Sequence, residues 1–342
     1  MVQRILGIQI GSEMIKLIET TRNKGAALNV ERCSYIDTPA NSVSNGTITD
    51  VEVLKEAISN EMAAQGMKGK KVVVVFESTA TINRTAIINK QTHSAIRSLL
   101  DTKPEDYLPV TGAEYQIDYK IMREFKDENG QDKMELMIVA VPNSIISPII
   151  KLMDDLKLDI QRITIPSEAL IKIFNKTAGI IKYLPSESCV INVGNLTSSV
   201  IFIRDGQANF YKNVDFGLTA YQNLLKESYL NSDVSLMPPE LKSQYDAQVR
   251  EVAYPMIESQ LIRPLERLTQ FYTTRFAQKN IETVYLIGGG ASIDFLDTYL
   301  SEAIGIPVVK VEHLNNITSN GLTKFNESSP YFIDILGAIN GL

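Results

Sequence analysis

The stretch GIQIGSEMIKL at residues 7–17 decides how the rest of the chain is interpreted, because an apolar run breaks at a glycine-serine turn and then resumes. Two later stretches repeat this pattern, VINVGNLTSSV at 190–200 and VYLIGGGAS at 284–292. A phosphate group needs backbone N–H groups at close approach, and glycine leaves room for that approach. Three such turns, widely separated in sequence, predict a nucleotide held in a cleft between two halves of the molecule.

Length and charge limit the classes of protein to which the chain can belong. At 342 residues it is too long for one simple core and suits two lobes. Hydrophobic residues make up 44% and charged residues 22%, as in an ordinary globular protein. The formal net charge of −6 argues against nucleic acid as the main partner, because a phosphate backbone is bound by a basic face.

Cysteine and histidine are too sparse for a metal cluster. Cys33 and Cys189 both lie among strand-like residues, and we expect them to be buried free thiols. His93 and His313 are expected at the surface or in loops rather than in a catalytic site. The chain starts on a strand-like run without signal-peptide features, and no window approaches about 20 uninterrupted apolar residues. We therefore expect a cytoplasmic protein.

The first part of the chain has the pattern of half a ribonuclease-H-like lobe. Apolar runs at 4–10, 14–20 and 27–35 predict a three-stranded meander with turns at 11–12 and 23–25. Helical spacing follows over 50–65, with Asp50 as the expected N-cap. The valine run at 71–76 predicts a strand buried on both faces.

A segment of different texture runs over 79–165 and predicts a small α+β subdomain inserted into the first lobe. Its expected elements are helices at 93–100 and 144–156 and strands at 115–123, 133–142 and 159–165. The charged stretch 126–133, which contains Gly130, predicts a hairpin loop between the first two of these strands. A further helix is expected at 168–177.

The opening pattern then repeats, which indicates a duplicated fold. A second meander is expected over 188–214, long helices at 218–229 and 247–279, a strand at 283–287, a helix at 293–304, a short strand at 308–309, and a last helix at 331–340 that packs on the first lobe. The predicted division is a first lobe at 1–78, 166–187 and 326–342, the insertion at 79–165, a second lobe at 188–217 and 281–325, and a helical subdomain at 218–280.

In this order and spacing the three turns resemble the two phosphate loops and the adenosine loop of the actin, Hsp70 and sugar-kinase superfamily. Within it, the chain resembles the PilM family of actin-like type IV pilus assembly proteins, relatives of the division protein FtsA. The stretches that carry this likeness are LPV at 108–110 before EYQIDY at 114–119, the strand-helix unit 136–158, RLTQFY at 267–272, and SPY at 329–331 with LGA at 336–338. The resemblance implies an α/β, actin-like ATPase fold.

The same resemblance implies impaired hydrolysis. Active ATPases of this superfamily place acids two residues before the first loop glycine, at the matching place before the second loop, and before the proline of the inter-lobe helix. Here those positions hold Gln9, Asn192 and Ile165. An amide cannot offset the charge of Mg²⁺ as a carboxylate does, so the terms that drive phosphoryl transfer are weakened. No residue is assigned a catalytic role, and no metal ligand is assigned.

Nucleotide binding rests on other groups, and we expect ATP or ADP, with or without Mg²⁺, as the ligand; a degenerate, empty cleft is the alternative. For Lys16 a solvated strand lysine is the favoured interpretation and a phosphate contact the alternative. Glu266 and Arg267 fit a solvated helix face as well as they fit neighbours of the nucleobase. The candidate binding residues are Gln9, Gly11, Ser12, Glu13, Lys16, Asn192, Gly194, Asn195, Thr197, Glu266, Gly288, Gly289, Gly290 and Ser292.

The family resemblance implies a scaffold in the pilus machine that binds the cytoplasmic N-terminal tail of a PilN-like bitopic membrane protein. The tail would enter a groove between the first lobe and the insertion and hold the protein at the inner face of the membrane. Pilus assembly ATPases and self-association are further candidate contacts. Two alternatives stay open: an FtsA-like filament former, disfavoured because the chain ends without a basic amphipathic tail, and a sugar- or acetate-kinase-like phosphotransferase, disfavoured by the missing carboxylates.

Overall fold

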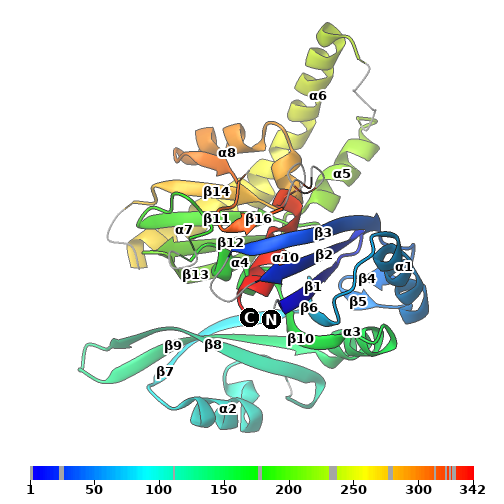
Figure 1. Cartoon of the computed structure of the whole chain (residues 1–342). Coiled ribbons are helices and arrows are strands. Elements are labelled where there is room, and N and C mark those ends of the chain that lie inside the picture. Colours follow the sequence, from blue (N-terminus) through cyan, green and yellow to red (C-terminus); the bar gives the residue numbers. More distant parts are fainter. Residues whose placement is uncertain are drawn as a thin grey trace.

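The structure is a computed structural model that describes residues 3–22, 27–110, 112–175, 179–230, 237–275, 280–311, 313–319, 322, 325 and 329–342. A six-stranded and a five-stranded sheet form two lobes, and a three-stranded sheet lies at the bottom of Figure 1. This arrangement confirms the predicted α/β fold of two similar lobes with an insertion. The turn expected at 23–25 lies outside the described residues.

The first sheet has the order β10-β6-β1-β2-β3-β16. The strands β1 (Gln3–Ile10), β2 (Met14–Arg22) and β3 (Leu28–Asp37) form the predicted meander, and β6 (Lys71–Phe76) pairs in parallel with β1. A small hairpin, β4 (Val43–Ser44) with β5 (Thr47–Ile48), precedes α1 (Val51–Ala64). As predicted, Asp50 caps α1, because its Oδ1 accepts a hydrogen bond from the Val53 N–H at 3.1 Å.

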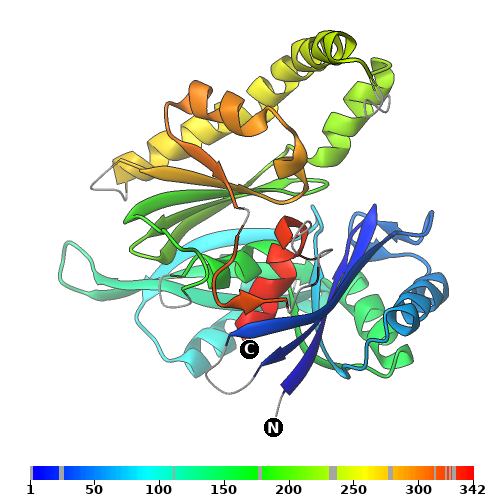
Figure 2. The same ribbon diagram turned by 45° about the horizontal axis from the view of Figure 1, so that its top comes forward.

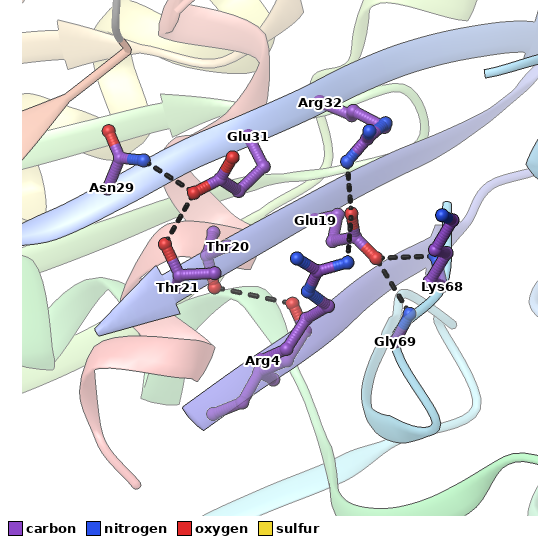
Figure 3. Close-up of polar contacts among 10 residues, drawn as sticks. Arg4, Glu19, Thr20, Thr21, Asn29, Glu31, Arg32, Lys68 and Gly69 are labelled. Carbon is purple, nitrogen blue, oxygen red and sulfur yellow. Dashed lines mark hydrogen bonds and ion pairs between the residues drawn. The ribbon is translucent and has the colours of Figure 1, made fainter. Parts of the chain in front are cut away.

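A buried carboxylate fixes the loop that leads into β6. Glu19 on β2 is fully buried, and its Oε1 accepts hydrogen bonds from the backbone N–H groups of Lys68 and Gly69 at 2.6 and 2.7 Å. Its Oε2 accepts one from Arg32 on β3 at 2.7 Å, as Figure 3 shows. A buried charge is tolerated where its lone pairs are all engaged. Glu19 therefore holds the loop, and with it the start of β6, against the sheet.

The second sheet repeats the plan of the first. Its order is β13-β12-β11-β14-β15, in which β11 (Glu187–Val193), β12 (Ser198–Arg204) and β13 (Gln207–Val214) form a meander. The strand β14 (Thr283–Ile287) pairs in parallel with β11, as β6 does with β1, and β15 (Val308–Lys310) follows α8 (Leu296–Ile304). The duplication predicted from the sequence is thus present in the pairing of the strands.

Two short helices, α4 (Pro166–Ile173) and α10 (Ile333–Asn340), lie between the lobes, and a short 3₁₀ turn, Ser329–Phe332, leads into α10. They pack so closely that a Cβ added at Gly337 would lie 2.2 Å from the carbonyl oxygen of Ala169. Side chains of both sheets share one core with them, including Val73 of β6 and Val190 of β11. The last helix therefore packs on the first lobe, as expected, and contacts β1 and β6. Both cysteines are buried and free, as predicted.

The insertion is smaller than the predicted 79–165. Its sheet, of order β7-β9-β8, consists of β7 (Ile82–Asn89), which we did not predict, β8 (Tyr115–Lys126) and β9 (Asp132–Pro142). With α2 (His93–Thr102) and 3₁₀ turns at Pro104–Asp106 and Gly112–Glu114 it has a core of its own. The next elements, α3 (Asn143–Asp155) and β10 (Asp159–Thr164), belong to the first lobe: Ile145 and Leu152 pack under its sheet, and β10 pairs with β6.

Two further boundaries differ from the prediction. The strand β16 (Ile317–Thr318) pairs with β3 of the first sheet, although 281–325 was assigned to the second lobe. The helical subdomain contains α5 (Leu218–Glu227), α6 (Pro239–Ile257), a π-helical turn (Glu258–Ile262) and α7 (Arg263–Arg275). α6 begins eight residues earlier than the predicted 247, with Pro239 in its first turn. Figure 2 shows α5 and α6 projecting together from the second lobe.

Candidate functional site

The three glycine turns converge where the two sheets face each other. Each follows the carboxyl end of a strand: Gly11 after β1, Gly194 after β11, and Gly288 after β14. Asn195 lies between them, because a Cβ added at Gly11 would be 3.7 Å from its Nδ2 and one added at Gly289 would be 3.9 Å from its Oδ1. The structure therefore brings together turns that lie up to 277 positions apart (288 − 11) in the sequence.

The third turn lies directly against the second, with no room for a side chain. Gly288 has φ +83°, and a Cβ added there would lie 2.3 Å from Asn192 Oδ1 and 2.5 Å from the Val193 carbonyl oxygen. A Cβ added at Gly290 would lie 2.2 Å from a methyl carbon of Val193. These glycines are therefore required by close approach as well as by backbone conformation.

The floor of the cleft contains a carboxylate that the sequence analysis missed. Asp334 on α10 is buried, and its two oxygens accept hydrogen bonds from Gln9 Nε2 at 3.2 Å and Asn192 Nδ2 at 3.4 Å. Both amides that replace the superfamily acids thus hold one shared acid. Burial raises the pKa of Asp334, although nearby Lys16 and the two amide hydrogen bonds oppose that rise.

Three buried acceptors around this floor have no hydrogen-bond partner within the part of the chain that the structure describes. They are Gln9 Oε1, Asn192 Oδ1 and the hydroxyl oxygen of Ser12. Buried polar atoms are normally satisfied, so such a group indicates a missing water, ion or ligand. A polyphosphate with its hydrated cation would supply partners for these atoms. The residues present therefore fit a bound nucleotide.

Lys16 lies among these groups rather than in solvent. It pairs with Gln9 in the β1–β2 register. Burial lowers the pKa of the Lys16 ammonium, opposed by the carboxylates of Asp334 and Glu77. Lys16 is therefore not a solvated strand lysine, and its contact with a phosphate stays a prediction.

Glu77, directly after β6, is a second acid that the sequence analysis missed. Its Oε1 accepts a hydrogen bond from Thr197 Oγ1 at 2.8 Å, across the two lobes. Burial raises the pKa of Glu77, and hydrogen bonds from Thr197 oppose this. The only signal in the sequence was an acid that ends a strand of buried valines.

Two predicted residues do not point into the cleft. Glu13 has an exposed side chain, and only its carbonyl oxygen is engaged, by the N–H of Thr38 at 3.0 Å. Glu266 is exposed on α7 and is not part of the pocket beside the third turn. That pocket, about 570 Å³, is lined from α5, α6 and the chain after the turn, with Ser292 and the α6 pair Asp246 and Arg250 among its walls. This pocket therefore has one acidic and one basic side chain of α6 in its wall, and the expected role of Glu266 stays a prediction.

A separate groove of about 610 Å³ lies between the insertion and the first lobe. One wall is β8, an outer strand of the three-stranded sheet, and the other is β10, an outer strand of the six-stranded sheet. Met137, Val139 and Ile163 contribute apolar surface, and Lys120 and Lys172 share the carboxylate of Glu168 at 3.3 and 3.6 Å. Ile165, in the position of the third superfamily acid, lines this groove and is buried.

The duplicated sheets, the helices between them and the three convergent turns define a protein of the actin-like ATPase fold. The chain belongs to the family described as type IV pilus assembly protein PilM, whose model matches residues 7–329. It is therefore an actin-like protein of type IV pilus assembly.

Two solved structures show the same fold. A chain described as "PilM-PilN type IV pilus biogenesis complex" is similar with a TM-score of 0.82 at 18% identity, over 98% of this chain and 98% of that one. Ethanolamine utilization protein EutJ from Carboxydothermus hydrogenoformans is similar with a TM-score of 0.54 at 13% identity, over 98% of this chain and 88% of that one.

Two kinds of feature are missing from the described part of the chain. No helix in the described ranges is long and apolar enough to cross a membrane. Across the same residues, no three His, Cys, Asp or Glu side chains gather in a way that could hold a metal ion.

Proposed function

We propose that this chain is a nucleotide-binding scaffold that holds the cytoplasmic tail of a PilN-like membrane protein, with weak or no hydrolysis. The observation that carries the proposal is the pairing of two sites in one molecule: a glycine-lined cleft with unsatisfied acceptors, and a groove between two outer strands. The choice of partner is supported by the similar solved structure, which is described as a complex of PilM with PilN.

Nucleotide would bind mainly through the backbone. The N–H groups of the three turns would face phosphate and ribose, Ser12 would donate its hydroxyl, and Lys16 would offset negative charge. Mg²⁺, when bound, neutralises phosphate charge, and here it would be held through water by the amide oxygens of Gln9 and Asn192. The pocket beside the third turn, with Asp246 and Arg250, would receive the base.

Weak hydrolysis follows from what surrounds the phosphate site. Both amides are tied to Asp334, which leaves that carboxylate engaged rather than free to bind a metal ion. Ile165, ahead of the inter-lobe helix, is apolar and buried, and so offers no group that could orient water. Gln9, Asn192 and Ile165 would therefore supply neither the base nor the charge that accelerates phosphoryl transfer in the superfamily.

The groove suits an extended peptide. Outer strands such as β8 and β10 carry backbone N–H and C=O groups that can pair with an added strand. Apolar side chains on the floor would anchor alternate residues of the tail. Binding there would tether the protein to the inner face of the membrane through its partner.

The helix α4 borders the groove and also a small pocket next to Thr197 of the second turn. Glu168 and Lys172 of α4 form part of the groove, while Pro166 and Ser167 of the same helix border a small pocket beside Glu77 and Thr197. A shift of α4 on nucleotide binding would therefore change the wall of the groove. We propose this helix as the route by which nucleotide alters tail affinity.

The test is calorimetric titration of a synthetic PilN-like N-terminal tail into the wild type and two matched variants. Ile163→Arg places a charge on the groove wall, whereas Ile150→Arg places the same charge on α3, where the native side chain is 42% exposed and outside the groove. We expect at least about tenfold weaker binding for Ile163→Arg alone, because a buried charge is costly. Equal affinities for all three proteins would contradict the groove assignment.

A further inference from the structure

The second glycine turn already holds an anion that belongs to the chain itself. The hydroxyl of Thr197 donates to Glu77 Oε1 at 2.8 Å. Glu77 Oε2 lies 2.9 Å from the place of a Cβ on Gly194. The carboxylate therefore lies in the mouth of the turn, in contact with the donors that a phosphoryl group would use.

The first turn differs from the second, because the hydroxyl of its serine makes no hydrogen bond within the described residues. The Ser12 hydroxyl has no hydrogen-bond partner among the residues described, and no carboxylate bonded to that turn is found there. The two phosphate turns thus differ in this chain: one is open, and one is filled by a side chain from the opposite lobe. The bond from Thr197 to Glu77 also links the second lobe to the end of β6.

We propose that Glu77 takes the place of a terminal phosphoryl group at the second turn, so that the cleft selects a nucleoside diphosphate over a nucleoside triphosphate. This inference rests on the proposed nucleotide binding and specifies the ligand of that same cleft. A diphosphate needs fewer donors and leaves Glu77 in place. A triphosphate brings additional negative charge to donors that the carboxylate occupies, and it must displace or neutralise that carboxylate.

The charged groups near Glu77 also disfavour a terminal phosphate at the second turn. Asp334 of α10 adds a second negative charge near Glu77, and Lys16 of β2 is the cation that both carboxylates face. One ammonium shared between two acids leaves little positive charge for a terminal phosphate. The Lys16 ammonium is also next to the first turn, and it can offset the charge of a phosphate bound at that turn.

The test compares MgADP and MgATP by calorimetry for the wild type, Glu77→Gln, Thr197→Val and Glu52→Gln. Glu52, exposed on α1, is the control for a lost negative charge. We expect the wild type and Glu52→Gln to bind MgADP at least about tenfold more tightly than MgATP, as one unscreened like charge would require. Glu77→Gln should reduce that ratio to near one. Thr197→Val, which removes only the hydroxyl that holds Glu77, should reduce it in part and serves if Glu77→Gln fails to fold.

The outcomes separate the two proposals. A wild type that binds MgATP as tightly as MgADP, with the same ratio in Glu77→Gln, overturns the role of Glu77 and leaves nucleotide binding intact. Absence of binding of either nucleotide to all four proteins overturns the nucleotide part of the proposed function, and the role of Glu77 with it.

Discussion

Gln9 in the first strand donates a hydrogen bond to Asp334 in the last helix, Nε2 to Oδ2 at 3.2 Å, although 325 positions separate the two residues. Asn192 of the second lobe donates to the other oxygen of the same carboxylate. An acid is thus present at this site on α10 rather than on β1 or β11, and its two hydrogen bonds connect both lobes to the last helix. This relationship makes Asp334 the first residue to test.

Asp334→Asn should stabilise the protein at neutral pH, because the variant removes a negative charge that burial disfavours. Because the pKa of Asp334 is raised, the folded protein binds this proton more tightly than the unfolded chain. Its contribution to stability is therefore greatest at low pH and is lost as the pH rises from the ordinary value near 3.8 through the raised one. Thermal unfolding between pH 4 and 8 should show a shallower decline for the variant, with Glu77 responsible for the remainder; equal slopes would contradict the assignment.

Gly288→Ala should abolish nucleotide binding, because the new Cβ meets Asn192 and the backbone of Val193. Gly305→Ala is the matched control: it also has a positive φ, +67°, but a Cβ there meets nothing within 4 Å. The control should lose about 1 kcal/mol of stability from backbone strain and keep its nucleotide affinity. Calorimetry with MgADP compares the two. Loss of binding in both would indicate a general effect of strain rather than a clash at the turn.

Glu19→Gln should lower the free energy of unfolding by about 3 kcal/mol, as expected when a buried and fully paired charge loses its partners. Figure 3 shows the carboxylate between Arg32 and the loop before β6. Glu31→Gln on the neighbouring strand is the control, because that carboxylate is only partly buried and is held by the neutral donors Thr21 and Asn29. Urea denaturation would measure both. A midpoint for Glu19→Gln equal to that of Glu31→Gln would remove the structural role.

Much of the fold was predictable where the local pattern was strong. The continuous apolar runs of β6 and β14 predicted those strands with the bounds that the structure has. The boundary of the insertion was predicted too late in the chain, because four of the six residues of β10 are polar and only their pairing with β6 places them in the first sheet. The first two turns of α6 were not predicted, because they are polar and project from the fold.

The site was predictable only in its backbone. Glycine turns are visible in sequence, and their convergence followed from the duplicated plan. The side chains that fill the cleft were not, because the importance of Glu77 and Asp334 comes from their distance to residues more than a hundred positions away. The helices that line the pocket beside the third turn are α5 and α6 rather than α7, which the sequence pattern alone did not indicate.

The most direct test of the central claim is calorimetric titration of the PilN-like tail peptide into the purified protein, first without nucleotide and then saturated with MgADP. The account predicts that nucleotide binds and that it changes the affinity for the tail by several-fold, because α4 borders both the groove and the small pocket beside Thr197 of the second turn. Tail binding of equal affinity in both titrations, with nucleotide bound, would contradict a switchable scaffold and leave an adaptor whose cleft does not communicate with its groove.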